Sequence, residues 1–240
     1  MEWYLFLILA LIAFLYSSVG HGGASGYLAF MGLVGFDTLF MKSTALTLNL
    51  FVSGIAFILY YRGGFFRFKL LWPFVLTSIP FAFIGAQILI DPKIYKIILG
   101  IFLILATVRM LINPKESVPV IRFSLPLTLI IGAILGLLSG MIGIGGGILL
   151  TPIIILLGWG NIKEAAAVSA PFIFLNSFSG LGGLMVNGFH FVPEILTWIA
   201  VVVTAGLLGS YVGSRRLTTK RLRFVLAFVL SIAGFKLLFY

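Results

Sequence analysis

Two glycine clusters, one of them with a histidine, are the residues whose types and spacing could bind a ligand. "GHGGASG" occupies residues 20 to 26 and "GIGGG" occupies residues 143 to 147, each between apolar runs. Adjacent glycines cannot form one packing face of a helix, and glycine accepts positive φ, so each cluster predicts a helix break. A helix that starts after such a break offers free N–H groups and its positive dipole end, which together favour an anion.

The composition places these breaks in a membrane protein. Of 240 residues, 61% are hydrophobic and 9% are charged, and the mean hydropathy is +1.22. One soluble core cannot bury that much apolar surface, so we predict an all-α polytopic membrane protein. The chain has no cysteine, which excludes thiolate metal sites, and we expect neither a metal nor a cofactor. The net charge is +10, and the basic residues lie in short loops between the apolar runs. This placement indicates that they orient the protein in the membrane and do not bind a nucleic acid.

Two of the ten apolar segments are shorter than the others. The ten segments cover residues 3–19, 24–36, 44–60, 70–90, 94–111, 125–141, 148–159, 165–186, 192–213 and 222–239. A spanning helix needs about 20 residues, so the second and seventh segments are short and each pairs with the long segment before it. We therefore expect about eight to ten membrane segments, and the pattern does not distinguish re-entrant from short spanning helices.

An internal repeat relates the two clusters. Residues 20, 22 and 23 align with residues 143, 145 and 146, all glycines at a constant offset of 123. Downstream, "STALT" at 43 to 47 matches "AAAVS" at 165 to 169, which relates Thr47 to Ser169. We predict two homologous halves, residues 1–112 and 125–240, joined by a cytoplasmic linker at 113–124. Each half has a glycine-broken helix pair and three spans.

Charge predicts how the halves are related. If each broken pair returns the chain to its starting side, twelve of the 16 Lys and Arg residues fall on one face and four on the other. The four are Lys42, Lys93, Lys96 and Lys236. Parallel repeats would divide them almost evenly. The positive-inside rule therefore favours inverted repeats in the cell membrane with both termini outside.

The expected binding site combines backbone groups of both breaks with polar side chains in the spans. The backbone candidates are Gly20, His21, Gly22, Gly23, Ala24, Gly143, Gly145, Gly146 and Gly147, with free N–H groups expected at 22–24 and 145–147. The side-chain candidates are His21, Thr47, Asn49, Ser169 and Asn176. His21 aligns with Ile144 in the repeat, so any role of the histidine is specific to the first half. That role is substrate contact, proton carrier or packing. Regularly spaced glycines at 132, 136, 140, 209 and 213 indicate helix packing instead.

No acidic residue falls inside an apolar segment; the six acids lie in loops or at segment ends. Cation pumps and cation antiporters usually carry such a carboxylate, so the sequence disfavours them. Anion export needs none, because the membrane potential supplies about 2.3 kcal/mol per charge per 100 mV.

The chain resembles the TauE/SafE family of sulfite exporter-like permeases over nearly its whole length. The resemblance rests on the tandem glycine-rich breaks, the repeat, "KSTALT" and above all "GLLSGMIGIGGGILLTPIIILLG" at 136 to 158. It implies a polytopic transporter of anions such as sulfite, sulfonates or related organic acids, commonly an exporter. The family motif falls on residues 143, 145, 146, 147 and Pro152, and on residues 20, 22 and 23. The first half departs from it with His21 opposite Ile144 and Ala24 opposite Gly147.

The sequence therefore predicts a secondary transporter, not an enzyme, with a small anion and the lipid bilayer as partners. It leaves open whether the protein forms a homo-oligomer. Two alternatives remain. A passive anion channel could use the same loops, and an intramembrane hydrolase could pair Ser139 or Ser179 with His21 or His190. The hydrolase is disfavoured because neither serine lies in a GxSxG context and no acid lies in a span.

Overall fold

A computed structural model describes residues 3–88, 124–186 and 195–218 continuously, together with single positions between 91 and 108 and between 221 and 238. The two predicted spans at 94–111 and 222–239, and all of the linker but Ser124, lie largely outside this part. Its elements are α1 (Trp3–Ser17), α2 (Ala24–Val34), α3 (Thr38–Arg62), α4 (Phe68–Gln87), α6 (Leu125–Ile142), α7 (Gly147–Leu156), α8 (Ile162–Val186), α9 (Ile195–Tyr211) and the π-helix η1 (Val212–Arg216).

The prediction of an all-helical, multi-pass membrane protein is confirmed for the described residues, which contain no strand. Five helical segments are long and apolar enough to cross a membrane: α3, α4, α6, α8, and α9 continued through η1. The glycine clusters separate α1 from α2 and α6 from α7, and both downstream helices are short, with 11 and 10 residues. The two predicted short segments, each after a glycine cluster, are therefore present as α2 and α7.

Helix α3 is longer than its apolar run, which the sequence places at 44–60. It begins at Thr38 because the Asp37 carboxylate accepts hydrogen bonds from the N–H groups of Leu39, at 2.9 Å, and Phe40, at 3.3 Å. Such a cap satisfies N–H groups that lack a partner within the helix. The helix therefore includes the polar turn around Lys42, and the predicted start was wrong by about two turns.

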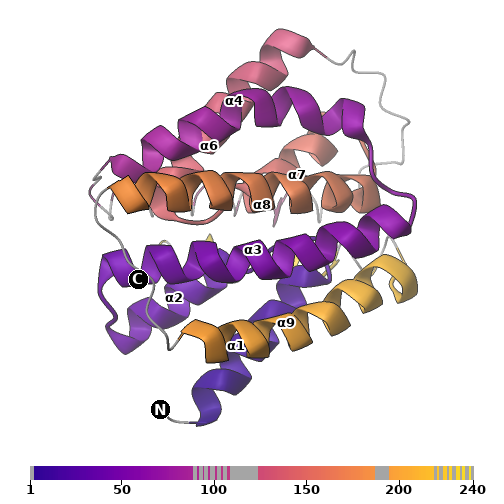
Figure 1. Ribbon diagram of the computed structural model, residues 1–240. Coiled ribbons are helices and arrows are strands. Elements are labelled where there is room, and N and C mark those ends of the chain that lie inside the picture. Colours follow the sequence, from indigo (N-terminus) through magenta and orange to yellow (C-terminus); the bar gives the residue numbers. More distant parts are fainter. Residues whose placement is uncertain are drawn as a thin grey trace.

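Helices α3 and α8 form the centre of the bundle and run antiparallel. Leu46 packs at Gly180, Asn49 lies 3.4 Å from the Ser177 hydroxyl, and a Cβ at Gly54 would meet the Phe174 ring at 3.5 Å. Residue numbers fall along one helix as they rise along the other. Figure 1 shows α4 and α6 on one side of this pair and α1 and α9 on the other.

Each of the two outer helix pairs combines one helix from each half. The first helix of each half packs against the fourth helix of the other half, α1 on α9 and α6 on α4. Equivalent glycines mediate both contacts: a Cβ at Gly209 would collide with the Phe14 carbonyl, and one at Gly85 with the Leu137 carbonyl. The contacts therefore follow the repeat, since the residues at 14 and 137 differ by the offset of 123.

The regularly spaced glycines pack helices together, as the sequence predicts. Cβ atoms at Gly132, Gly136 and Gly140 would meet backbone of α4, and one at Gly213 would collide with the Ser18 carbonyl. Small residues allow helix backbones to approach this closely.

Basic residues gather at one end of the bundle. Arg67, after α3, lies 3.4 Å from the Glu164 carboxylate at the start of α8. Lys163 donates to the Ser214 carbonyl of η1 at 3.3 Å. Three segments that the sequence assigns to the basic face therefore contact one another.

Candidate functional site

The first helix break, residues 18–23 (break 1), follows α1. Its turn is fixed by backbone: the Gly20 N–H donates to the Ser17 carbonyl, and the His21 N–H donates to the Tyr16 carbonyl at 2.9 Å. Gly20 has φ 78° and Gly23, the N-cap of α2, has φ 99°. Only glycine adopts this region without strain, which explains both positions.

The second helix break, residues 143–146 (break 2), repeats this path. Gly143 has φ 85° and Gly146, the N-cap of α7, has φ 73°. The Ile144 N–H donates to the Ser139 carbonyl at 3.3 Å, which is the equivalent of the bond from His21. The sequence prediction of two helix breaks at these glycines is confirmed.

The two breaks start at opposite ends of α3 and meet near its middle. At the start of break 1 the Ser18 carbonyl accepts a bond from the Tyr60 hydroxyl at 2.6 Å. At the start of break 2 a Cβ on Gly143 would lie 3.1 Å from the Lys42 Cα. Lys42 and Tyr60 belong to opposite ends of α3. The chain therefore enters the centre of the bundle from two directions.

Asn49, near the middle of α3, joins the two breaks. Its Oδ1 accepts the Ala24 N–H at 3.0 Å, and its Nδ2 donates to the Ile144 carbonyl at 3.2 Å. Cβ atoms on Gly22 and on Gly145 would both press against its amide, so both positions need glycine. The side chain is fully buried. An unsatisfied amide would be costly there, and these bonds hold it in one orientation.

His21 forms a second link between the halves. Its Nδ1 lies 3.1 Å from the Val19 carbonyl and its Nε2 lies 3.1 Å from the Gly147 carbonyl, the first residue of α7. The residue is 2% exposed. Both ring nitrogens therefore face carbonyl oxygens, one in each half.

Backbone N–H groups gather where the breaks meet. Within the described residues no acceptor is assigned to the N–H groups of residues 22, 23, 145, 146 and 147. Ala24 corrects the sequence prediction, because its N–H is bonded to Asn49 and is not free. The remaining N–H groups, at the starts of two helices, form a positive field that suits an anion.

A buried hydroxyl without a partner lies beside each N-cap glycine. A Cβ on Gly23 would lie 2.7 Å from the Tyr27 hydroxyl, and one on Gly146 would lie 3.3 Å from the Ser139 Cβ. Both hydroxyls are buried and have no hydrogen-bond partner in the described part of the chain. Buried polar groups are usually satisfied, so these two are available to donate to a ligand.

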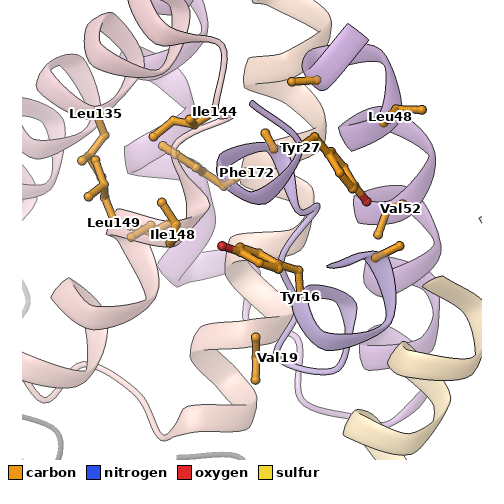
Figure 2. Close-up of a cluster of buried hydrophobic side chains, with 14 of the residues drawn as sticks. Tyr16, Val19, Tyr27, Leu48, Val52, Leu135, Ile144, Ile148, Leu149 and Phe172 are labelled. Atoms are coloured by element: carbon orange, nitrogen blue, oxygen red, sulfur yellow. The ribbon is translucent and has the colours of Figure 1, made fainter. Parts of the chain in front are cut away.

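Protein encloses the meeting point. Every residue from 16 to 25 and from 139 to 152 is buried. Apolar side chains of both halves, among them Tyr16, Tyr27, Ile144 and Phe172, form the surrounding cluster (Figure 2). In this conformation the two breaks are closed to solvent.

Comparison with known proteins gives the family. The model of the family described as "Sulfite exporter TauE/SafE" matches residues 5–237. The chain belongs to this family. It is 35% identical over 233 residues to "Probable membrane transporter protein y4hK" of Sinorhizobium fredii, covering 95% of this chain and 94% of that protein.

Two more distant relatives carry the same kind of name. "Probable membrane transporter protein MJ0441" of Methanocaldococcus jannaschii is 30% identical over 60% of this chain and 57% of its own length. "Probable membrane transporter protein YunE" of Bacillus subtilis is 27% identical over 69% of this chain and 68% of its own length. No solved structure matches the chain. The TauE/SafE chain is therefore a membrane transporter by family.

The sequence-predicted site residues fall into three groups. Those at the meeting point are His21, Gly22, Gly23, Ala24, Asn49, Gly145, Gly146, Gly147 and Ser169, whose carbonyl would lie 3.2 Å from a Cβ on Gly147. Gly20 and Gly143 lie at the outer ends of the breaks, against Ala166 and Lys42. Thr47 and Asn176 donate to carbonyls of their own helices, those of Ser43 and Phe172.

The predicted set left out several polar side chains at the breaks. Ser177 lies 3.4 Å from the Asn49 amide, and Thr151 shares a 2.6 Å hydrogen bond with Ser169. Tyr27 and Ser139 lie beside the N-caps, and Lys42 lies beside Gly143. The repeat offers a partial signal, because Ser139 aligns with Tyr16 and both carbonyls accept the turn-closing bond. The other contacts join distant segments, which no local pattern reveals.

Proposed function

We propose that this TauE/SafE transporter carries a small anion, sulfur-containing and normally exported, in the space where breaks 1 and 2 meet. One observation carries the proposal: at the glycine N-caps of α2 and α7, with φ 99° and 73°, the N–H groups of residues 22, 23, 145, 146 and 147 have no assigned acceptor in the described part of the chain. Gly22 and Gly145 lie against Asn49, so these groups gather in one place. Glycine lets an anion approach the backbone, and two helix N-termini share its charge. Sulfite, thiosulfate and sulfonates have the size and oxygen pattern that such donors recognise.

Burial of both breaks favours a carrier over a channel. All residues from 16 to 25 and from 139 to 152 are covered, so an anion enters only after the halves move relative to each other. The two outer helix pairs and the central α3–α8 pair are the surfaces along which such movement would occur. A carrier turns over slowly, whereas an open channel conducts far faster. Single-channel currents from planar bilayers would favour the channel.

We also propose that the protein is inserted in the cell membrane as an inverted repeat, with the basic end in the cytoplasm. The antiparallel course of α3 and α8, which are equivalent in the repeat, supports this topology. The chain has no cysteine, so single cysteines report accessibility directly. Arg62→Cys should react only with cytoplasmic reagent, whereas Val34→Cys and Glu2→Cys should react only from outside. The opposite pattern would overturn the orientation.

The function is tested by flux. Purified protein in liposomes should transport at least one of radiolabelled sulfite, thiosulfate and methanesulfonate, and protein-free liposomes provide the baseline. Transport of none of them, with or without an imposed potential, would reject the proposal.

Substitutions at the breaks test the site. Gly22→Val would drive a side chain into Asn49, and Gly146→Val would strain a residue at φ 73° beside Phe172. Both should abolish flux while the purified protein stays monodisperse. Gly35→Ala is the matched control, because Gly35 also has positive φ, 86°, but nothing lies within 4 Å of an added Cβ. Normal flux in both valine variants would argue against a backbone anion site.

The described contacts give the hydrolase alternative little support. Neither candidate serine is bonded to the His21 imidazole: the Ser139 hydroxyl has no partner in the described part, and Ser179 donates to the Ile79 carbonyl at 2.6 Å. The His21 ring nitrogens face the carbonyls of residues 19 and 147 instead. His190 lies outside the described residues. Covalent labelling by a fluorophosphonate would revive this alternative.

A further inference from the structure

We propose that His21 binds a proton that crosses the membrane together with the anion, so that transport is proton-coupled. This inference rests on the proposed function and names the coupling ion of the same site. It starts from the surroundings of the imidazole, which offer two acceptors and no donor among the contacts assigned to the ring. Nδ1 faces the Val19 carbonyl and Nε2 faces the Gly147 carbonyl, both at 3.1 Å.

The two carbonyls match the protonated ring. A neutral imidazole has one N–H, so it donates to one carbonyl and turns the lone pair of its other nitrogen toward the second. An imidazolium has two N–H groups and satisfies both oxygens. Val19 belongs to break 1 and Gly147 to α7, so the protonated ring joins the two halves and the neutral ring releases one of them.

A charge on this ring needs a countercharge, because the residue is buried and the cost of an unpaired buried charge is high. The proposed anion would supply it. Gly22 follows His21 directly in the chain, and the N–H of Gly147 belongs to the residue whose carbonyl faces the ring. Each ion therefore lowers the cost of burying the other, and their binding is cooperative.

Among the residues that the structure describes, no other ionisable group at the breaks fits this role as well. Tyr16 and Tyr27 lie on α1 and α2, and Tyr60 and Lys42 lie on α3. The Tyr16 hydroxyl is bonded to Ser25 and the Tyr60 hydroxyl to the Ser18 carbonyl, while Lys42 lies at the outer end of break 2. Helices α6 and α7 contain no ionisable side chain, and α8 has only Lys163 and Glu164, at the basic end.

Cotransport changes the driving force. One proton neutralises a monovalent anion, so the loaded carrier would move no net charge and the membrane potential would not drive it. A pH difference would drive it instead, with about tenfold accumulation on the alkaline side per pH unit for one proton per anion. Export from a more alkaline cytoplasm therefore requires an outward anion gradient steeper than this ratio. An uncoupled carrier would show the reverse dependence.

The test uses methanesulfonate and thiosulfate, whose charges of −1 and −2 do not change between pH 5.5 and 8. Liposomes are clamped at zero potential with equal potassium and valinomycin, and the interior is made one pH unit more alkaline than the exterior. Wild-type protein should accumulate the anion about tenfold above the external concentration and acidify the interior, as read by entrapped pyranine. Imposed voltage should affect thiosulfate but not methanesulfonate.

In His21→Gln the side-chain amide supplies an N–H donor in place of the imidazole, but it cannot titrate. It should carry the anion only to equal concentrations and should respond to voltage with both probes. If it does not fold, His21→Ile, which installs the residue of the second half, replaces it. Thr77→Ala is the matched control, since it removes a 2.8 Å bond to the Leu129 carbonyl between halves, away from the breaks. The control should keep pH-driven accumulation.

The outcomes separate the two proposals. Flux that follows voltage and ignores the pH difference in wild type would overturn proton coupling and leave the anion carrier standing. Accumulation that survives in His21→Gln would assign the proton elsewhere and overturn the role of His21. So would a Tyr16→Phe or Tyr27→Phe variant that keeps anion flux but loses pH-driven accumulation. Absence of any anion flux in wild type would reject both proposals.

Discussion

Breaks 1 and 2 turn at equivalent glycines, yet different side chains hold them in place. Gly20 and Gly143 have φ 78° and 85°, and the N-caps Gly23 and Gly146 also have positive φ. Break 1 accepts a bond from the Tyr60 hydroxyl at Ser18, contains His21, and is followed by Ala24, whose N–H donates to Asn49. Break 2 accepts a bond from the Asn49 amide at Ile144, has no ionisable side chain of its own, and is followed by Gly147, whose carbonyl faces His21. The backbone path follows from the repeated glycines, and the asymmetric side chains make one half the place where substrate or proton selectivity would reside.

The largest expected difference between the breaks concerns their first glycines. Gly20→Ala and Gly143→Ala both place a Cβ at positive φ, which costs about 1 to 2 kcal/mol. At Gly20 the Cβ would also lie 2.5 Å from the Ala166 carbonyl, whereas at Gly143 it meets Lys42 at 3.1 Å or more. We expect Gly20→Ala to be less stable than Gly143→Ala by about 2 kcal/mol, from the added overpacking. Thermal unfolding in detergent measures this, and equal midpoints would contradict the packing difference.

Asn49→Leu should be the next largest effect. The change keeps volume but leaves the Ala24 N–H and the Ile144 carbonyl without their partner, at about 1 to 3 kcal/mol for a buried group. Asn176→Leu is the control, because Asn176 bonds only the Phe172 carbonyl of its own helix. Flux and unfolding midpoint should both fall for Asn49→Leu and fall less for Asn176→Leu. If the two variants behave alike, Asn49 does not join the breaks.

Tyr60→Phe tests the tie that is particular to break 1. It removes the 2.6 Å bond to the Ser18 carbonyl, worth about 1 kcal/mol. Tyr61→Phe is the matched control, since Tyr61 is 58% exposed. The expected result is a lower midpoint and faster hydrogen exchange in residues 18–23 for Tyr60→Phe only. Exchange that is unchanged in this segment would show that the tie does not hold break 1.

The smallest effect is expected at the basic end. Arg67→Ala removes the 3.4 Å pair with Glu164, but the Arg67 side chain is 56% exposed. Exposed pairs contribute about 0 to 1 kcal/mol and weaken in salt. The midpoint should therefore fall slightly at low salt and match wild type in about 1 M salt, where charges are screened within about 3 Å. A large fall in the midpoint that persists in high salt would mean that the segment between α3 and α4, which contains Arg67, helps to position break 1.

The sequence predicted the elements better than their contacts. Hydropathy located the helices, because membrane spans need long apolar runs, but it placed the start of α3 at residue 44 instead of Thr38. The error arose because the Asp37 cap extends the helix through the polar turn at Lys42, outside the apolar run. Regular glycine spacing predicted that the helix with glycines at 132, 136 and 140 packs closely against another helix, and the structure identifies that helix as α4.

By itself the sequence determined that the chain is a helical membrane protein, that two helices break at glycines 123 residues apart, and that the acids lie in loops or at the ends of apolar segments. These features follow from local composition and backbone freedom, which need no partner. Tertiary structure alone decided that the breaks meet at Asn49, that the Ala24 N–H is capped, and that His21 faces a carbonyl of each half. Apart from the local contact of His21 with Val19, those contacts join residues 25 to 126 positions apart, so they depend on how the helices pack.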